Sequence, residues 1–115
     1  MKVTIEELEA YLLDHYGNSG IDQSLFMKLV EEIGEVAEVL NKKAGRKASG
    51  NENLQAQLGN ELADVIHYAI AIAALNGLDM NEIIIKKDTS ASVKYSHRTN
   101  LEQFIVDKRN RELDN

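Results

Sequence analysis

Two groups of acidic residues have the types and spacing expected of a divalent-metal site. Glu32 and Glu35 are three residues apart in one apolar segment, and Glu31 precedes them, which gives the pattern EExxE. Glu61 and Asp64 follow in a second apolar segment with the pattern ExxD. Residues three apart are neighbours on a helix face, so each pair directs two carboxylates to one side. If the two helices lie side by side, four carboxylates converge into an oxygen-rich site that suits a hard divalent cation.

The surroundings of these acids differ from those of an ordinary solvated charge run. On a helical wheel, Glu32, Glu61 and Asp64 point among apolar residues, whereas Glu35 lies at the border and Glu31 faces solvent. Buried carboxylates are costly unless they are paired, hydrogen-bonded or bound to metal. The sequence has no Lys or Arg from residue 29 to 41 or from residue 48 to 85. A cation is the simplest solution, and the alternatives are a distant lysine or protonated carboxyls with raised pKa values.

The ligand chemistry indicates which ion would bind. All the candidate ligands are oxygen atoms and the chain has no Cys, which favours Mg²⁺, or Mn²⁺, over Zn²⁺. Mg²⁺ keeps several waters and also takes phosphate oxygens, so a rigid carboxylate site suits the handling of phosphates. His67 follows Asp64 by three residues and is either a metal ligand or, as we favour, a core or interface histidine. Tyr68 lies one turn after Asp64 and either stacks on a base or packs in the core.

The elements that must position these residues are helices. The chain has no Pro, and its apolar residues recur at helical spacing, which predicts an all-α fold. Thr4 and Glu7 form a capping box for a helix over residues 4–16, which residues 17–20 end. Asp22 or Ser24 would cap a second helix over residues 23–44. Its expected core stripe is formed by five apolar residues: Leu29, Ile33, Val36, Ala37 and Leu40.

The remaining helices follow from the same signals. A third helix is expected over residues 54–76, ended by Asn76 and Gly77. Asp79, with Glu82, would cap a short fourth helix, followed by an irregular polar stretch over residues 89–97. Thr99 with Glu102 would cap a last helix over residues 100–111, and residues 106–115 are expected to fray. Residues 41–53 form a loop with four cations, either a solvated connector or a mobile basic flap over an anionic substrate.

Composition and charge restrict the class of protein. A length of 115 residues suits a single domain, residues 1–115, with a modest core. The formal net charge of -6 argues against a nucleic-acid partner, which would require a basic stripe. The N-terminus lacks the apolar region of a signal peptide, and the longest apolar run, residues 65–75, is short for a membrane span, so we expect a cytoplasmic protein. The third helix is apolar on nearly all sides, which predicts burial by a second subunit in a homodimer or homotetramer.

The segments LVEEIGEVAEVL and GNELADVIHYAIAIA resemble the MazG-like nucleoside triphosphate pyrophosphohydrolases, over about residues 24–87. The resemblance implies an oligomeric bundle of four to five helices and Mg²⁺-dependent hydrolysis of a nucleotide between its α- and β-phosphates. It implies that the metal ligands are four carboxylates, those of Glu32, Glu35, Glu61 and Asp64. Under this resemblance, Glu31, beside Glu32, either orients or deprotonates the attacking water or holds a second metal through water.

The sequence departs from this family after the fourth helix, where it reads KKDTSASVKYSHRTN. Lys86 or Lys87 would stabilise the charge on the leaving pyrophosphate, and Lys94 and Arg98 are further candidates for phosphate contacts. Two other interpretations remain open at this point. One is a non-catalytic helical module that binds a metal or a basic partner, and the other is a hydrolase of a related phosphoanhydride such as phosphoribosyl-ATP.

Overall fold

The described part of the chain consists of five α-helices without a β-strand, which confirms the predicted all-α fold. The structure is a computed structural model and describes residues 1–17, 22–46, 50 and 53–114. The helices are α1 (Ile5–Tyr16), α2 (Asp22–Lys43), α3 (Leu54–Leu75), α4 (Met80–Lys94) and α5 (Leu101–Leu113). The chain divides into two compact units, Met1–Leu78 and Asp79–Asn115, which are described in turn.

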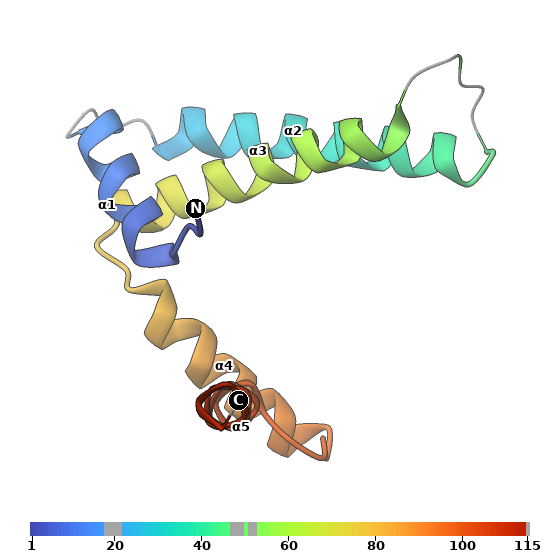
Figure 1. Cartoon of the computed structure of the whole chain (residues 1–115). Helices are drawn as coiled ribbons and strands as arrows, with labels where there is room; N and C mark the ends of the chain where they lie inside the picture. The colour runs from blue at the N-terminus through green and yellow to red at the C-terminus, as the bar shows by residue number, and fades with distance from the viewer. Residues whose placement is uncertain (18–21, 47–49, 51–52, 115) are drawn as a thin grey trace. The chain divides into compact units, whose positions relative to one another are not determined.

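In the first unit, α2 and α3 run side by side in opposite directions, and α1 packs against α3 (Figure 1). α1 begins as predicted, because Thr4 Oγ1 accepts from the Glu7 amide at 3.1 Å and Glu7 Oε1 accepts from the Thr4 amide at 3.1 Å. Gly17 ends the helix with a φ of +59°, a conformation that glycine adopts without strain. The rest of the expected turn, residues 18–20, lies outside the described residues.

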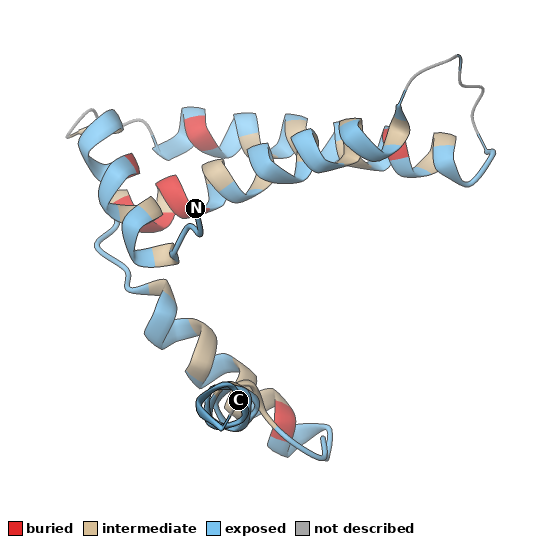
Figure 2. Cartoon of the chain, in the orientation of Figure 1, coloured by how far each residue is buried: buried red, intermediate tan, exposed pale blue. Residues whose placement is uncertain are grey.

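The buried side of α2 differs from the prediction. Leu25 and Val39 are buried, and Leu29, Glu32 and Val36 are half-buried between them (Figure 2). The prediction was correct for Leu29 and Val36 and wrong for the other three residues, all of them exposed: Ile33, Ala37 and Leu40. The reason is that α2 carries two adjacent apolar stripes, and α3 covers only one of them within this chain.

The ends of α2 and α3 are joined by polar contacts. α2 already includes Asp22 and Ser24, so the prediction that one of them caps the helix from outside was wrong. Asp22 Oδ2 instead accepts from Asn76 Nδ2 at 3.2 Å, which links the start of α2 to the end of α3. Asn53 caps α3 by accepting from the Ala56 amide at 3.0 Å, and Asn76 ends it as predicted. The predicted loop is helical as far as Lys43, and its residues 47–49 and 51–52 lie outside the described part.

α3 has the length and composition of a helix that can cross a membrane, the only such helix among the described residues. The sequence argument against a membrane span rested on the shorter run over residues 65–75, whereas the helix itself has 22 residues. Its middle carries Glu61 and Asp64, and it packs against both α1 and α2. The core helix of a globular protein has the same properties, so length and composition do not place α3 in a membrane.

In the second unit, α4 is longer than predicted. Asp79 caps it by accepting from the Asn81 amide at 3.1 Å, whereas Glu82 forms an ion pair with Lys86 at 2.9 Å. Residues 89–94, which we predicted to be irregular, are helical, because α4 continues to Lys94. The prediction was wrong for these residues. The helix backbone satisfies two of the polar side chains: Thr89 Oγ1 donates to the Ile85 carbonyl at 2.9 Å and Ser92 Oγ donates to the Thr89 carbonyl at 2.8 Å.

α5 begins one residue later than the sequence indicated. Asn100, and not Thr99, is its N-cap and accepts from the Gln103 amide at 2.8 Å. Asp88 Oδ2 accepts from the Leu101 amide at 2.6 Å, which ties α4 to the first turn of α5. The helix continues to Leu113, so the part of residues 106–115 that the structure describes is mostly helical, where we expected fraying.

The cap of α5 can be tested by a pair of neighbouring substitutions. Asn100→Ala removes the side-chain acceptor for the Gln103 amide and is expected to lower the free energy of unfolding by about 1 kcal/mol. Thr99→Ala is the matched control and is expected to change it by only a few tenths of a kcal/mol. Urea unfolding followed by circular dichroism measures both. A larger loss for Thr99→Ala than for Asn100→Ala would contradict the observed cap.

Candidate metal centre

Three acids from α2 and α3 converge on one point. Glu32 lies on the side of α2 that faces α3, between the half-buried Leu29 and Val36. Glu61 and Asp64 lie one turn apart on α3, with Glu61 half-buried and Asp64 exposed, so the expectation that Asp64 points among apolar residues was wrong within this chain. One carboxylate oxygen from each of Glu32, Glu61 and Asp64 lies within 4.8 Å of the other two. The structure therefore brings together, across two helices, three of the four predicted metal ligands.

The proximity of these carboxyl groups changes their titration. Hydrogen bonds with the side chains of Glu35 and Glu32, together with burial and the negative charges of both, raise the pKa of Glu61 to about 7. The hydrogen bond with Glu61 by itself lowers the pKa of Glu32, but burial and the negative charges of Glu35 and Asp64 outweigh it. The pKa of Glu32 is therefore raised as well. Without a cation, the cluster retains protons at a pH where ordinary carboxyls are ionised.

Two oxygen atoms test whether the cluster fits a metal ion. Glu32 Oε2 and Glu61 Oε2 are both buried, and neither has a hydrogen-bond partner among the described residues when the carboxyls are ionised. A buried acceptor without a donor is destabilising, and one way to satisfy it is a proton on a neighbouring carboxyl, consistent with the raised pKa of Glu61. The other way is a cation. A hard divalent ion satisfies all these oxygens at once, so the residues present fit Mg²⁺ or Mn²⁺.

The other two acids of EExxE occupy different positions. Glu35 is exposed, and its side chain contacts the cluster through the hydrogen bond with Glu61. Glu31 is also exposed and forms an ion pair with Lys28 at 3.4 Å on the surface of α2. Neither acid belongs to the three-residue group: Glu35 adjoins it through Glu61, whereas Glu31 lies on the surface beside Lys28. The roles assigned to both residues from the sequence stay predictions.

His67 lies outside the acidic group and has a different partner. Its Nε2 atom lies 2.6 Å from the Tyr16 hydroxyl in a part-buried hydrogen bond between α3 and α1. This contact favours the interpretation of His67 as a core histidine over that of a metal ligand. Tyr68 is half-buried, with its ring edge-on to His67 at 4.9 Å between centroids. Sequence reasoning missed the part played by Tyr16, because nothing local relates two residues 51 positions apart.

The predicted phosphate-binding lysines lie on α4, in the second unit. Lys86 is exposed and paired with Glu82. Lys87 and Lys94 line a pocket of about 330 Å³ together with Ser90, Ala91 and Tyr95. The Lys94 ammonium lies 5.3 Å from the centre of the Tyr95 ring, a cation–π contact. The pocket is cationic, as a phosphate contact would require, and the assignment of these lysines to substrate stays a prediction.

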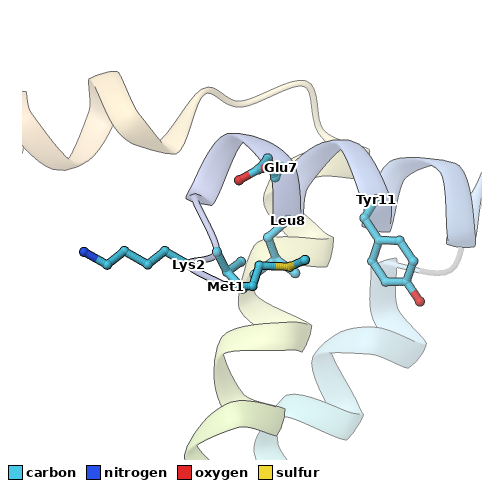
Figure 3. A pocket seen from close by; sticks show the side chains of 6 residues that line it. Met1, Lys2, Glu7, Leu8 and Tyr11 are labelled. Carbon is cyan, nitrogen blue, oxygen red and sulfur yellow. The ribbon is translucent and has the colours of Figure 1, made fainter.

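A further pocket lies beside the N-terminal segment and the start of α1 (Figure 3). It has a volume of about 270 Å³ and a mostly apolar lining made of six residues: Met1, Lys2, Val3, Glu7, Leu8 and Tyr11. The Glu7 carboxylate already accepts hydrogen bonds from Thr4 in the capping box. None of the predicted catalytic or metal-binding residues lines this pocket, so it is not the candidate centre.

Comparison with known proteins shows the family to which the chain belongs. Residues 22–100 match the MazG nucleotide pyrophosphohydrolase domain, so the chain belongs to this family of nucleotide pyrophosphohydrolases. It is similar to the crystal structure of iMazG from Vibrio DAT 722, with 26% sequence identity and a TM-score of 0.61. The match covers 81% of this chain and 98% of that chain. A search of curated proteins gave no match. The family resemblance inferred from the two acidic motifs is thereby confirmed.

Proposed function

We propose that the chain hydrolyses a nucleoside or deoxynucleoside triphosphate between the α- and β-phosphates, giving a nucleoside monophosphate and pyrophosphate. The observation that carries this proposal is the convergence of Glu32, Glu61 and Asp64 within 4.8 Å, on two helices of a MazG domain. The two buried Oε2 atoms without donors support a cation at this point. We propose Mg²⁺ as that cation, with Mn²⁺ as its substitute.

The proposed roles follow from the positions of the acids. Glu32, Glu61 and Asp64 would hold the cation, with Glu35 as the fourth ligand. When bound, Mg²⁺ neutralises charge on the triphosphate and lowers the pKa of a bound water. Glu31 and Glu32, adjacent in the sequence, are the proposed residues that orient the water and accept its proton. The water oxygen forms a bond to the α-phosphorus, and the bond from that phosphorus to the bridging oxygen breaks, so pyrophosphate leaves with the bridging oxygen.

The direct test is a panel of ordinary and damaged nucleotides, assayed for pyrophosphate release with Mg²⁺ and with Mn²⁺. Turnover of at least one nucleotide that depends on the metal is the expected result. The absence of turnover across the panel would argue against the proposal. Thermal melts add a second readout, because a ligand that binds the native state raises its stability. Stabilisation by Mg²⁺ alone, with no further effect of any nucleotide, would favour a metal-binding module that is not an enzyme.

We propose in addition that the protein acts as a homo-oligomer, a dimer or a tetramer. Apolar side chains three or four residues apart form an exposed stripe on α2, from Phe26 through Ile33 to Leu40. α3 also has exposed apolar side chains, with Leu62 exposed by 43% and Ile66 by 54%. An exposed apolar stripe of this kind is typical of an interaction site. A second copy of the same chain would present the same stripes and cover them symmetrically.

A charge placed on the stripe tests this assembly. Ile66→Glu is expected to shift the protein from dimer or tetramer to monomer, because a buried unpaired carboxylate is costly in an apolar interface. Ala56→Glu is the matched control, since Ala56 is exposed on the same helix but outside the stripe. Size-exclusion chromatography with light scattering gives the masses, relative to 12.9 kDa for one chain. A monomeric wild type at high concentration would contradict the assembly.

A further inference from the structure

A row of rings connects α1 to α3, and two of them, His67 and Tyr68, follow Asp64 by three and four residues. The Tyr16 hydroxyl and His67 Nε2 are 2.6 Å apart, and the two rings meet edge to face with centroids at 5.7 Å. The imidazole of His67 in turn meets the ring of Tyr68 edge to face, at 4.9 Å and with an angle of 76° between the planes. The hydrogen bond therefore fixes the imidazole, and the imidazole limits the orientation of the Tyr68 ring.

The Tyr16–His67 hydrogen bond has the features of a specific contact. Burial, with smaller contributions from Tyr68 and Tyr11, raises the pKa of Tyr16, so the phenol keeps its proton near neutral pH. The phenol hydroxyl donates to a bare Nε2 atom or accepts from an Nε2–H group, and the tautomer of His67 decides which. A short and part-buried hydrogen bond adds a directional constraint on the two rings to the packing between the helices.

Tyr68 is the ring of this row that shares a stripe of α3 with the acids. It follows Asp64 by one helical turn, a rise of about 6 Å. Counted at about 100° per residue, Tyr68 lies between Glu61 and Asp64 on the circumference of α3, so the three residues share one stripe. When the phosphates of a ligand bind at the cluster and its planar group extends along α3 toward α1, that planar group would therefore meet the Tyr68 ring. In a nucleotide, the planar group attached to the phosphates through the sugar is the base.

We infer that Tyr16 and His67 are positioning residues that hold Tyr68 in the orientation in which it contacts the base of the bound nucleotide. This inference rests on the proposed function, because it needs a nucleotide whose phosphates bind at the acidic cluster. Under this inference the site has two parts with different ligands. The carboxylates recognise the metal and the phosphates, and the Tyr16–His67–Tyr68 row recognises the base.

The test compares two tyrosines of the same helix. Tyr16→Phe keeps the ring and removes the hydroxyl, whereas Tyr11→Phe makes the same change at an exposed tyrosine whose ring stacks on His15. The probes are the four α,β-imido deoxynucleoside triphosphates and inorganic tripolyphosphate, each with Mg²⁺, titrated by calorimetry. Tyr16→Phe is expected to weaken the tightest nucleotide analogue by about three- to tenfold, the scale of one hydrogen bond. Its affinity for tripolyphosphate, which has no base, should stay within about twofold of the wild type.

The control and the outcomes separate this inference from the proposed function. Tyr11→Phe should bind every probe as the wild type does. Equal affinities of Tyr16→Phe and wild type for the nucleotide analogues, even with a lower melting temperature, would reduce the hydrogen bond to a structural contact and overturn the inference alone. Equal losses for tripolyphosphate and for the analogues would also overturn it. A wild type that binds tripolyphosphate but no nucleotide analogue, or neither, would overturn the proposed function and this inference with it.

A double-mutant cycle provides the second variant. His67→Gln removes the imidazole edge against Tyr68 and is expected to weaken the same analogue by a similar factor. Because both residues act through one contact, the double variant Tyr16→Phe with His67→Gln should be no weaker than the weaker single variant. Losses that multiply in the double variant would show that the two residues act separately and would overturn the inference.

Discussion

Glu61→Gln is expected to reduce pyrophosphate release at least about 100-fold and, in the metal-free protein, to raise the stability of the fold. Activity falls while the stability of the metal-free protein rises, because the same carboxylate binds a cation when one is present and repels the neighbouring carboxyls when none is. Glu61 lies with Glu32 and Asp64 in the three-residue group, and hydrogen bonds with Glu35 and Glu32, burial and the negative charges of these two acids raise its pKa to about 7. The amide of glutamine has nearly the same shape but carries no charge.

The activity loss follows from metal affinity. Loss of a residue that merely orients a metal ligand costs about 10- to 100-fold in affinity or activity, so loss of a ligand should cost at least the upper end of that range. The gain in stability follows from the raised pKa, since burying a neutral amide among carboxyls avoids both the repulsion and the proton that relieves it. The amide also donates, which gives a neighbouring carboxylate oxygen a hydrogen bond.

The measurement pairs turnover at saturating Mg²⁺ with urea unfolding in EDTA. Glu38→Gln is the matched control, an exposed acid on α2 outside the cluster, and its turnover should remain within about twofold of the wild type. Turnover by Glu61→Gln within a few fold of the wild type would remove Glu61 from the metal site. A less stable metal-free variant would mean that the cluster is not under electrostatic strain.

The features that sequence predicted well depend on local information. The capping box of Thr4 and Glu7 and the end of α3 at Asn76 are set by residues within one turn of the helix end. The same rules fail at Thr99, because two adjacent residues can both cap a helix and only the fold decides between them. The irregular stretch expected from residue 89 was wrong for a related reason. Thr and Ser favour turns only when the helix does not satisfy their hydroxyls, and here it does at Thr89 and Ser92.

Tertiary features were predicted to different degrees. The convergence of Glu32, Glu61 and Asp64 was predictable, because acids in apolar segments without nearby cations need one another or a metal. The choice between the two apolar stripes of α2 was not, because Ile33 and Leu40 are as apolar as Leu25 and Val39 and only the position of α3 distinguishes them. The Tyr16–His67 contact joins residues far apart in the chain, and no local pattern encodes such a pair.

The stability of the metal-free protein is expected to fall as the pH rises from about 4.5 to about 7. The pKa of Glu61 rises from an ordinary 4.5 to about 7 on folding, so between these values the native state binds more protons than the unfolded state. Stability then decreases with pH, because it rises only where the unfolded state binds more protons. The contribution of the Glu61 proton is complete below the unfolded pKa and is lost as the pH passes the folded one. The raised pKa of Glu32 acts in the same direction.

A divalent cation should reverse this trend. Metal ligands bind in the deprotonated form, so Mg²⁺ competes with the protons of the cluster and its stabilising effect grows as the pH rises.

Urea unfolding at a series of pH values, in EDTA and in excess MgCl₂, measures both curves. Glu61→Gln in EDTA is the control, and the difference between it and the wild type isolates the cluster from the histidines that titrate in the same range. That difference should widen from pH 4.5 to pH 7 in EDTA, with the wild type becoming the less stable of the two. In MgCl₂ at neutral pH the wild type should instead be the more stable, because it alone retains the full ligand set. A difference in EDTA that stays constant with pH would show that Glu61 titrates normally and that the three carboxyls are not coupled.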